Sequence, residues 1–226
     1  MNEKMISTGL ELLEAEFGKD KVKKCIAAVC KFKIEIPGWI FGEFGGGRFA
    51  GYMPPACARN IYEKLDDAAF VNKLTRATDS VAMHVLWDFS NDEVSGSYKI
   101  ARQVNDAAQE RGLKVGSISP TYFLKGSYRG SLSADEAETR QRYIEQTVLA
   151  GEIARDYGIG LVTLWLPDGS QYPGQANLQR AMRNLRTALD EIHRQMDKNV
   201  RLLIEYKLFE PGTYSTVLSD WGSAYM

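Results

Sequence analysis

Short apolar runs alternate with longer amphipathic segments along most of the chain. The apolar runs are rich in β-branched and aromatic residues and are bounded by polar or glycine-containing turns, a pattern that predicts buried strands. The segments between them repeat apolar residues three and four positions apart and predict helices. The predicted strands are Phe32–Pro37, Val81–Trp87, Leu113–Ile118, Leu161–Leu166 and Val200–Tyr206.

The predicted helices separate these strands. Ser133-Ala134-Asp135-Glu136 has the spacing of a capping box, so we expect a helix to begin at Ser133, and Gly158 is placed to end it. A last segment, from Gly212 to Tyr225, begins a further helical pattern. The other predicted helices cover Gly9–Val29 and, approximately, Cys57–Ala77, Tyr98–Arg111 and Gln175–Met196.

Strands that alternate with helices predict a parallel sheet built from right-handed crossovers. Such a sheet is either open and doubly wound or part of a barrel. The first strand is not followed by a G-x-G-x-x-G turn, because Gly45-Gly46-Gly47 lies several residues beyond the strand end. This argues against a dinucleotide-binding fold.

Polar and aromatic residues at the ends of successive strands favour the barrel, since active sites of TIM barrels are built there from several strands at once. We therefore predict an α/β fold of the (β/α)8 TIM-barrel type. It is incomplete, with about five of the eight βα units, and residues 1–226 are the N-terminal portion of one such domain. The strand-end residues are Trp39, His84 with Trp87 and Asp88, Ser119 with Tyr122, Trp165 with Asp168, and Glu205 with Lys207.

Composition limits the classes of binding partner that we expect for this protein. The chain has 28 basic and 29 acidic residues and a net charge of -1, so no long-range field favours nucleic acid or an anionic membrane. No apolar run approaches the ~20 residues that span a bilayer, and the N-terminus lacks a secretory signal pattern. The three cysteines, Cys25, Cys30 and Cys57, fit neither a redox pair nor a zinc knuckle and are expected to be buried or half-buried thiols. These features predict a cytoplasmic protein.

Glu205 and Lys207 are the most informative pair. They lie two positions apart at the end of the last predicted strand and therefore project from the same face. Opposite charges that leave an apolar strand toward a barrel interior require a partner, a metal or a substrate. One interpretation is an ion pair between them at the barrel rim. The functional interpretation makes Glu205 a divalent-metal ligand and Lys207 a partner of a substrate oxygen.

Two further strand-end residues have both a structural and a functional interpretation. His84 lies in an apolar strand and could be a satisfied core residue, but Trp87 and Asp88 follow it closely. Trp165 could be barrel packing, or it could stack on the apolar face of a sugar ring. His193 lies among polar residues in the middle of a predicted helix and is expected to face solvent.

Trp39 precedes a loop in which three consecutive glycines are followed by Phe49. Consecutive glycines make a poor rigid cradle for phosphate but suit a mobile lid, which would carry Phe49.

Several of these segments together resemble the broad-specificity bacterial L-rhamnose isomerase family, which also interconverts rare sugars such as D-allose and D-psicose. The resemblance covers essentially the whole chain, and the second half matches closely. The segments that carry it are Pro37–Trp39 with Gly45–Phe49, Met83–Asp88, Trp165–Gln175, Ile204–Pro211 and Ser215–Gly222.

The resemblance implies a metal-dependent aldose–ketose isomerase, typically tetrameric and using Mn²⁺ at two metal sites. It implies that Glu205 bridges the two metal ions and that Lys207 and His84 contact substrate. It also implies an aromatic wall of Trp39, Phe49 and Trp165, with Phe49 reaching the site of a neighbouring subunit. The other metal ligands of the family belong to later strands.

A metal bound by Glu205 alone would lack the several ligands that Mn²⁺ or Mg²⁺ requires, so we expect this chain to be inactive by itself. A second hypothesis is a non-catalytic half-barrel that assembles with another chain. A third is a phosphodiesterase of related barrel type acting on abasic DNA, which would need clustered histidines and a basic surface. Two histidines and a net charge of -1 argue against it.

Overall fold

The computed structural model describes residues 3–42, 56–89, 100–122, 127, 130–166, 174–207 and 216–225. The chain divides into two compact units, Met1–Ile34 and Glu35–Met226. The assignment of residues 1–226 to one barrel domain stays a prediction.

The first unit contains two helices, α1 (Glu3–Phe17) and α2 (Lys19–Val29). The single helix predicted over Gly9–Val29 is therefore wrong. The two helices are separated at Gly18, whose φ of 85° lies in the left-handed region that glycine adopts without a steric penalty. The expected burial of the cysteines is wrong for Cys25 and Cys30, which are exposed, whereas Cys57 is half-buried.

The second unit is built on five parallel strands that pair in the order β1-β2-β3-β4-β5. Neighbours in sequence are thus neighbours in the sheet, without the reversal that defines a doubly wound fold. This is the strand order of a TIM barrel, of which the described strands are five of the eight. The strands are β1 (Ile36–Pro37), β2 (Ser80–His84), β3 (Lys114–Ser119), β4 (Leu161–Trp165) and β5 (Arg201–Glu205).

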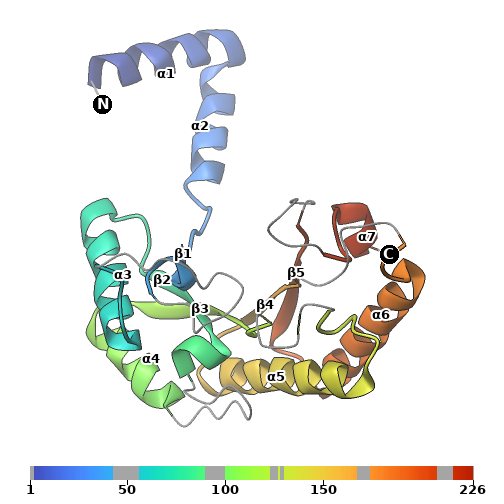
Figure 1. The fold of residues 1–226 in the computed structure, drawn as a ribbon. Helices are drawn as coiled ribbons and strands as arrows, with labels where there is room; N and C mark the ends of the chain where they lie inside the picture. The colour runs from blue at the N-terminus through green and yellow to red at the C-terminus, as the bar shows by residue number, and fades with distance from the viewer. Residues whose placement is uncertain are drawn as a thin grey trace. The chain divides into compact units, whose positions relative to one another are not determined.

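Helices follow the strands in turn, and in Figure 1 α3, α4, α5 and α6 succeed one another around the outside of the strands. Three short helical segments, η1, η2 and α7, complete the described part of the unit. The bounds are η1 (Gly38–Ile40), α3 (Ile61–Thr75), η2 (Val85–Phe89), α4 (Ala101–Glu110), α5 (Ala137–Asp156), α6 (Leu178–Gln195) and α7 (Trp221–Tyr225).

Four of the five predicted strands are shorter in the structure, the fourth by one residue and the fifth by two. The first is reduced to Ile36–Pro37, since only these two residues pair with β2 and residues 32–35 do not join the sheet. The second ends at His84 rather than Trp87. The backbone N–H of His84 donates to the Asp88 carboxylate at 2.6 Å, and the chain enters a π-helical turn, η2, at Val85.

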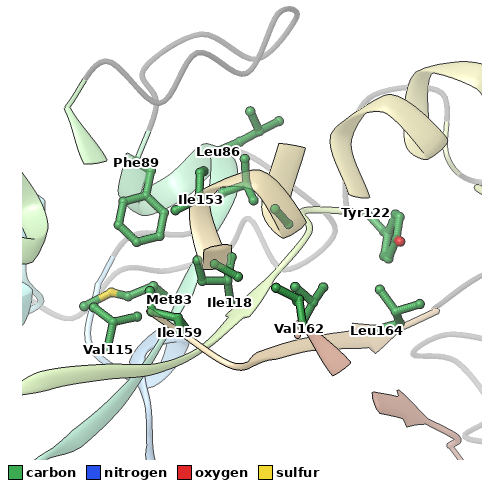
Figure 2. Packing of buried hydrophobic residues seen from close by; sticks show 14 of the residues in the cluster. Met83, Leu86, Phe89, Val115, Ile118, Tyr122, Ile153, Ile159, Val162 and Leu164 are labelled. Atoms are coloured by element: carbon green, nitrogen blue, oxygen red, sulfur yellow. The ribbon is translucent and has the colours of Figure 1, made fainter. Parts of the chain in front are cut away.

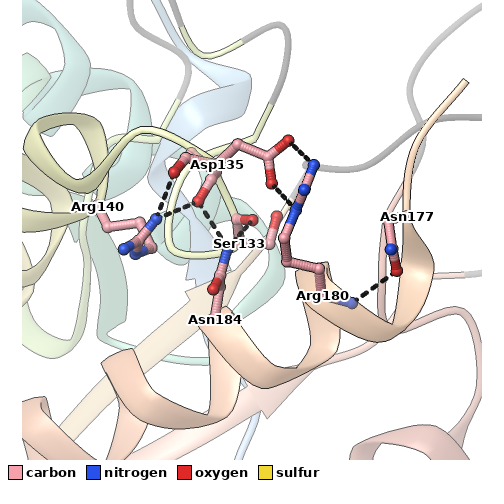
Figure 3. Close-up of polar contacts among 7 residues, drawn as sticks. Ser133, Asp135, Arg140, Asn177, Arg180 and Asn184 are labelled. Atoms are coloured by element: carbon pink, nitrogen blue, oxygen red, sulfur yellow. Dashed lines mark hydrogen bonds and ion pairs between the residues drawn. The ribbon is translucent and has the colours of Figure 1, made fainter.

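The predicted capping box at Ser133 is also wrong, since α5 begins at Ala137. The residues before it are held by side chains of α6 and by Arg140 of α5 itself (Figure 3). Asp135 pairs with Arg180 on α6, and the carbonyl of Ala134 accepts hydrogen bonds from Arg140 and Asn184. The contacts from α6 are long-range, and together with Arg140 they hold this turn in place of the predicted cap.

The core lies between the strands and the outer helices (Figure 2). Met83, Ile118, Val162 and Leu164 are fully buried, and Ile118 pairs with Val162 in the parallel register. Because side chains alternate along a strand, the residues next to these face the side of the sheet away from the helices.

Candidate functional site

The strand-end residues His84, Ser119, Trp165 and Glu205 share one face of the sheet. His84, Ser119 and Trp165 each come directly after a buried residue that faces the helices, so their side chains point to the opposite face of the sheet. Glu205 pairs with Trp165 in the parallel register and therefore shares its face. His84 pairs with Ser119, and Trp165 pairs with Glu205. The parallel register therefore places these side chains along the carboxyl edge of the sheet, where TIM-barrel sites form.

Trp165, Glu205 and Lys207 make one cluster at the ends of β4 and β5. The Lys207 Nζ lies 3.4 Å from Glu205 Oε1 and 5.6 Å from the centroid of the Trp165 ring. The side chains of Lys207 and Glu205 are 36% and 47% exposed. The ion pair foreseen as one interpretation of these two residues is present, and because both side chains reach solvent it stabilises the fold little. An aromatic face, a carboxylate and an ammonium are thus brought together.

A second cluster surrounds His84 at the end of β2. The Asp88 carboxylate accepts from Lys64 Nζ at 2.5 Å through Oδ1 and from the His84 backbone N–H at 2.6 Å through Oδ2. Lys64 comes from α3, so one buried carboxylate joins a helix to a strand end. The His84 ring lies against Trp87, with 4.6 Å between ring centroids.

His84 is 7% exposed, and its Nδ1 has no hydrogen-bond partner within the described part of the chain. Burial lowers the pKa of His84 from 6.5 to about 4, with Asp88 opposing this change and Lys64 adding to it. The imidazole is therefore neutral near pH 7, with one ring nitrogen able to accept and the other able to donate.

Trp39 follows β1 in η1 and is 47% exposed. The preceding Gly38 lies against the backbone of β2, where a Cβ would overlap the carbonyl oxygen of Ala82. This close approach fixes the start of η1 beside β2. Phe49 and Asp168 lie outside the described residues, so the predicted lid and its aromatic side chain stay predictions.

The described residues do not fit a complete metal centre. Among them no group of three or more His, Cys, Asp or Glu side chains is placed to hold a metal ion. Glu205 offers one carboxylate, which Lys207 already pairs, and Mn²⁺ or Mg²⁺ requires several oxygen or nitrogen ligands.

Lys64 is the member of the site that the sequence did not suggest. A lysine on an amphipathic helix is ordinarily exposed, yet Lys64 is buried. Its position four residues before the buried Ala68 was the available signal, because such residues share a helix face. His193 is exposed on α6, as predicted. In the part of the chain that the structure covers, no helix is both long and apolar enough to cross a membrane.

A parallel sheet in sequence order, helices outside it and polar and aromatic side chains along its carboxyl edge define a protein of the TIM-barrel class. Comparison with known sequences gives the family: residues 76–218 match the family described as xylose isomerase-like TIM barrel. The chain belongs to that family.

Two curated relatives are named probable sugar isomerases. One, from Rhizobium meliloti, is 34% identical over 97% of this chain and 50% of its own length. The other, from Mesorhizobium japonicum, is 34% identical over 88% of this chain and 46% of its own length. The chain therefore spans about half the length of these relatives.

Solved structures support the fold. A D-allulose 3-epimerase from Methylomonas sp. superimposes with a TM-score of 0.56 at 11% identity, over 86% of this chain and 57% of that one. An L-ribulose 3-epimerase gives a TM-score of 0.50 at 16% identity, over 85% of this chain and 55% of that one. At these identities the likeness concerns the fold alone.

Proposed function

We propose that this chain supplies the sugar-facing wall of a TIM-barrel isomerase that interconverts an aldose and a ketose. The observation that carries the proposal is the cluster of Trp165, Glu205 and Lys207 at adjoining strand ends. Two relatives named probable sugar isomerase support the reaction class. The resemblance to L-rhamnose isomerases supports the pair L-rhamnose and L-rhamnulose, or a related rare-sugar pair, as substrates.

Each residue has a role suited to its chemistry. The Trp165 ring stacks on the apolar face of the sugar, as aromatic side chains do in carbohydrate sites. The Lys207 ammonium donates to a sugar oxygen and stabilises negative charge that develops there as C1 and C2 exchange oxidation state. His84, as a neutral imidazole, hydrogen-bonds a sugar hydroxyl. Trp39 and Phe49 extend the aromatic wall.

The complete enzyme, in this proposal, is a cytoplasmic homotetramer that uses Mn²⁺, and Phe49 reaches the site of a neighbouring subunit. Glu205 is the candidate metal ligand of this chain and the second catalytic residue beside Lys207. Since no group of three or more His, Cys, Asp or Glu side chains among the described residues could hold a metal ion, the metal would need ligands from other residues. The chain by itself is therefore proposed to be inactive.

Sugar binding tests the proposal. We would titrate the ¹⁵N-labelled chain with L-rhamnose, L-rhamnulose, D-allose and D-psicose and follow amide chemical shifts. Shifts that localise to the ends of β4 and β5, and that require about tenfold more sugar in Lys207→Met, support a sugar site there. If none of these sugars shifts any of those amides, the assignment is refuted.

Turnover tests the metal argument separately. Incubation of the chain with Mn²⁺ and L-rhamnose should yield no L-rhamnulose. Robust conversion would show that the ligands around Glu205 are sufficient and would contradict the proposed inactivity.

A second candidate is a half-barrel that assembles with another chain supplying further strands. It is favoured by β5, which pairs with β4 and with no other strand among those described. Its Leu203 and Ile204 are 44% and 36% exposed, and the adjacent Tyr206 is 43% exposed. Size-exclusion chromatography with light scattering discriminates: a stoichiometric complex supports this role, and a monomer that binds sugar supports the first.

A further inference from the structure

Of the ion pairs among the described residues, that between Lys64 and Asp88 has both side chains buried. The two side chains are 7% and 0% exposed, and 2.5 Å separates Nζ from Oδ1. Removing two charges from water costs several kcal/mol per ion, and replacing such a pair with apolar residues is often neutral or stabilising. Stability alone is therefore a weak reason for this pair.

The placement of the pair indicates another role. Asp88 uses its second oxygen to accept the backbone N–H of His84, the last residue of β2. That contact closes the π-helical turn η2 and brings the Asp88 side chain back beside the end of β2. Lys64 anchors the same carboxylate to α3. The backbone of His84 is thus held by a helix that is distant in sequence.

The ring of His84 is constrained as well. Trp87, inside the same turn, lies against it at a centroid distance of 4.6 Å and an interplanar angle of 34°. His84 is 7% exposed, and its Nδ1 is buried without a hydrogen-bond partner in the described residues. An unsatisfied buried nitrogen is costly and is common where a ligand completes the hydrogen bonding.

We propose that Lys64 and Asp88 are positioning residues, whose buried ion pair fixes the end of β2 so that the His84 imidazole is held ready to hydrogen-bond a sugar hydroxyl. The inference rests on the proposed sugar site. It adds to that site two residues that touch no substrate and act through His84.

The test exploits the histidine content of the chain. His84 and His193 are the two histidines, so ¹⁵N-histidine labelling gives two ring spin systems, and the exposed His193 serves as an internal reference. We would compare the wild type with Lys64→Leu/Asp88→Leu, which leaves no unpaired charge, and with Asp88→Asn, which keeps an oxygen for the His84 N–H. Lys73→Leu, at an exposed position of the same helix, is the matched control.

The double variant should remain folded by circular dichroism, yet its His84 ring signals should shift or broaden while those of His193 stay unchanged. Its sugar affinity should fall about tenfold, the loss of roughly one hydrogen bond. Asp88→Asn should lie between the wild type and the double variant, and Lys73→Leu should match the wild type.

Two results would overturn the proposal: wild-type His84 signals in the folded double variant, or loss of folding in both variants, which would make the pair purely structural. The sugar titration reports on a different claim. If the wild type binds no sugar, the proposed function fails, while the ring signals still decide whether Lys64 and Asp88 position His84.

Discussion

Lys207 and Trp165 form a cation–aromatic contact across two adjoining strand ends, with the ammonium 5.6 Å from the centre of the ring. Glu205, the register partner of Trp165, contacts the same ammonium, with 3.4 Å between Lys207 Nζ and Glu205 Oε1. The cation–aromatic contact places the lysine ammonium over the Trp165 ring. Because Lys207 is partly exposed, its contribution to folding and its contribution to binding can be separated.

The first prediction concerns Lys207→Met, which keeps the aliphatic stem and removes the charge. Stability should change by about 0.5 kcal/mol or less, as expected for a partly exposed pair. Sugar binding should weaken by about tenfold, since a charge-assisted hydrogen bond is lost. Urea denaturation and calorimetric titration measure the two effects. Lys198→Met, at an exposed position, should leave both unchanged.

The second prediction concerns pH. The pKa of His84 is 6.5 when it is solvated and about 4 in the fold because the ring is buried. The unfolded chain therefore binds an extra proton between these values, and stability falls as the pH falls from 6.5 toward 4. The difference between the two pKa values corresponds to about 3 kcal/mol in the free energy of unfolding. This contribution to stability is fully present above pH 6.5 and is lost as the pH falls toward 4.

His84→Gln, which cannot titrate, should lose this part of the pH dependence. Urea denaturation at pH values across the window measures it. His193→Gln should keep the wild-type profile, because His193 is exposed. Parallel stability curves for the wild type and His84→Gln would contradict the buried, neutral imidazole.

Much of the fold was predictable because local patterns decide it. The alternation of apolar runs and amphipathic segments gave the five strands, and strand ends that carry Trp165 and Glu205 proved to be neighbours in register. Parallel strands connected through helices align their carboxyl ends, so residues remote in sequence could be placed on one edge. Phe49, outside the described residues, stays a prediction.

What the sequence could not supply depends on long-range contacts. Helical spacing could place Lys64 on the buried face of α3, but no local pattern marks its pairing with Asp88, which lies 24 positions further along the chain. The start of α5 moved from Ser133 to Ala137 because contacts from α6 hold the preceding turn, which outweighs a local cap worth about 1 kcal/mol.

The third prediction concerns that turn. The side-chain amide of Asn184 on α6 donates a hydrogen bond to the carbonyl of Ala134 at 2.9 Å (Figure 3). Ala134 is almost fully buried. Asn184→Ala should destabilise the fold by about 1 kcal/mol, the typical net value of one hydrogen bond. Thermal or urea unfolding measures it. Arg183→Ala, at the adjacent exposed position, is the control and should change stability by less than about 0.5 kcal/mol. Equal effects in the two variants would contradict a specific contact.

The last prediction concerns Gly38, which begins η1 immediately before Trp39. A Cβ at this position would overlap the carbonyl oxygen of Ala82 and lie 3.6 Å from Cγ2 of Val81, so η1 and β2 must separate to admit it. The movement is costly because it shifts the backbone of η1 or of β2 and not a flexible side chain. Gly38→Ala should therefore destabilise the fold by about 2 kcal/mol. Gly160→Ala is the matched control, because no atom lies within 4 Å of its Cβ. Urea denaturation compares them, and since the movement displaces Trp39, the fluorescence of the native state should change in Gly38→Ala alone. A Gly38→Ala variant as stable as Gly160→Ala would show that η1 does not pack against β2 as described.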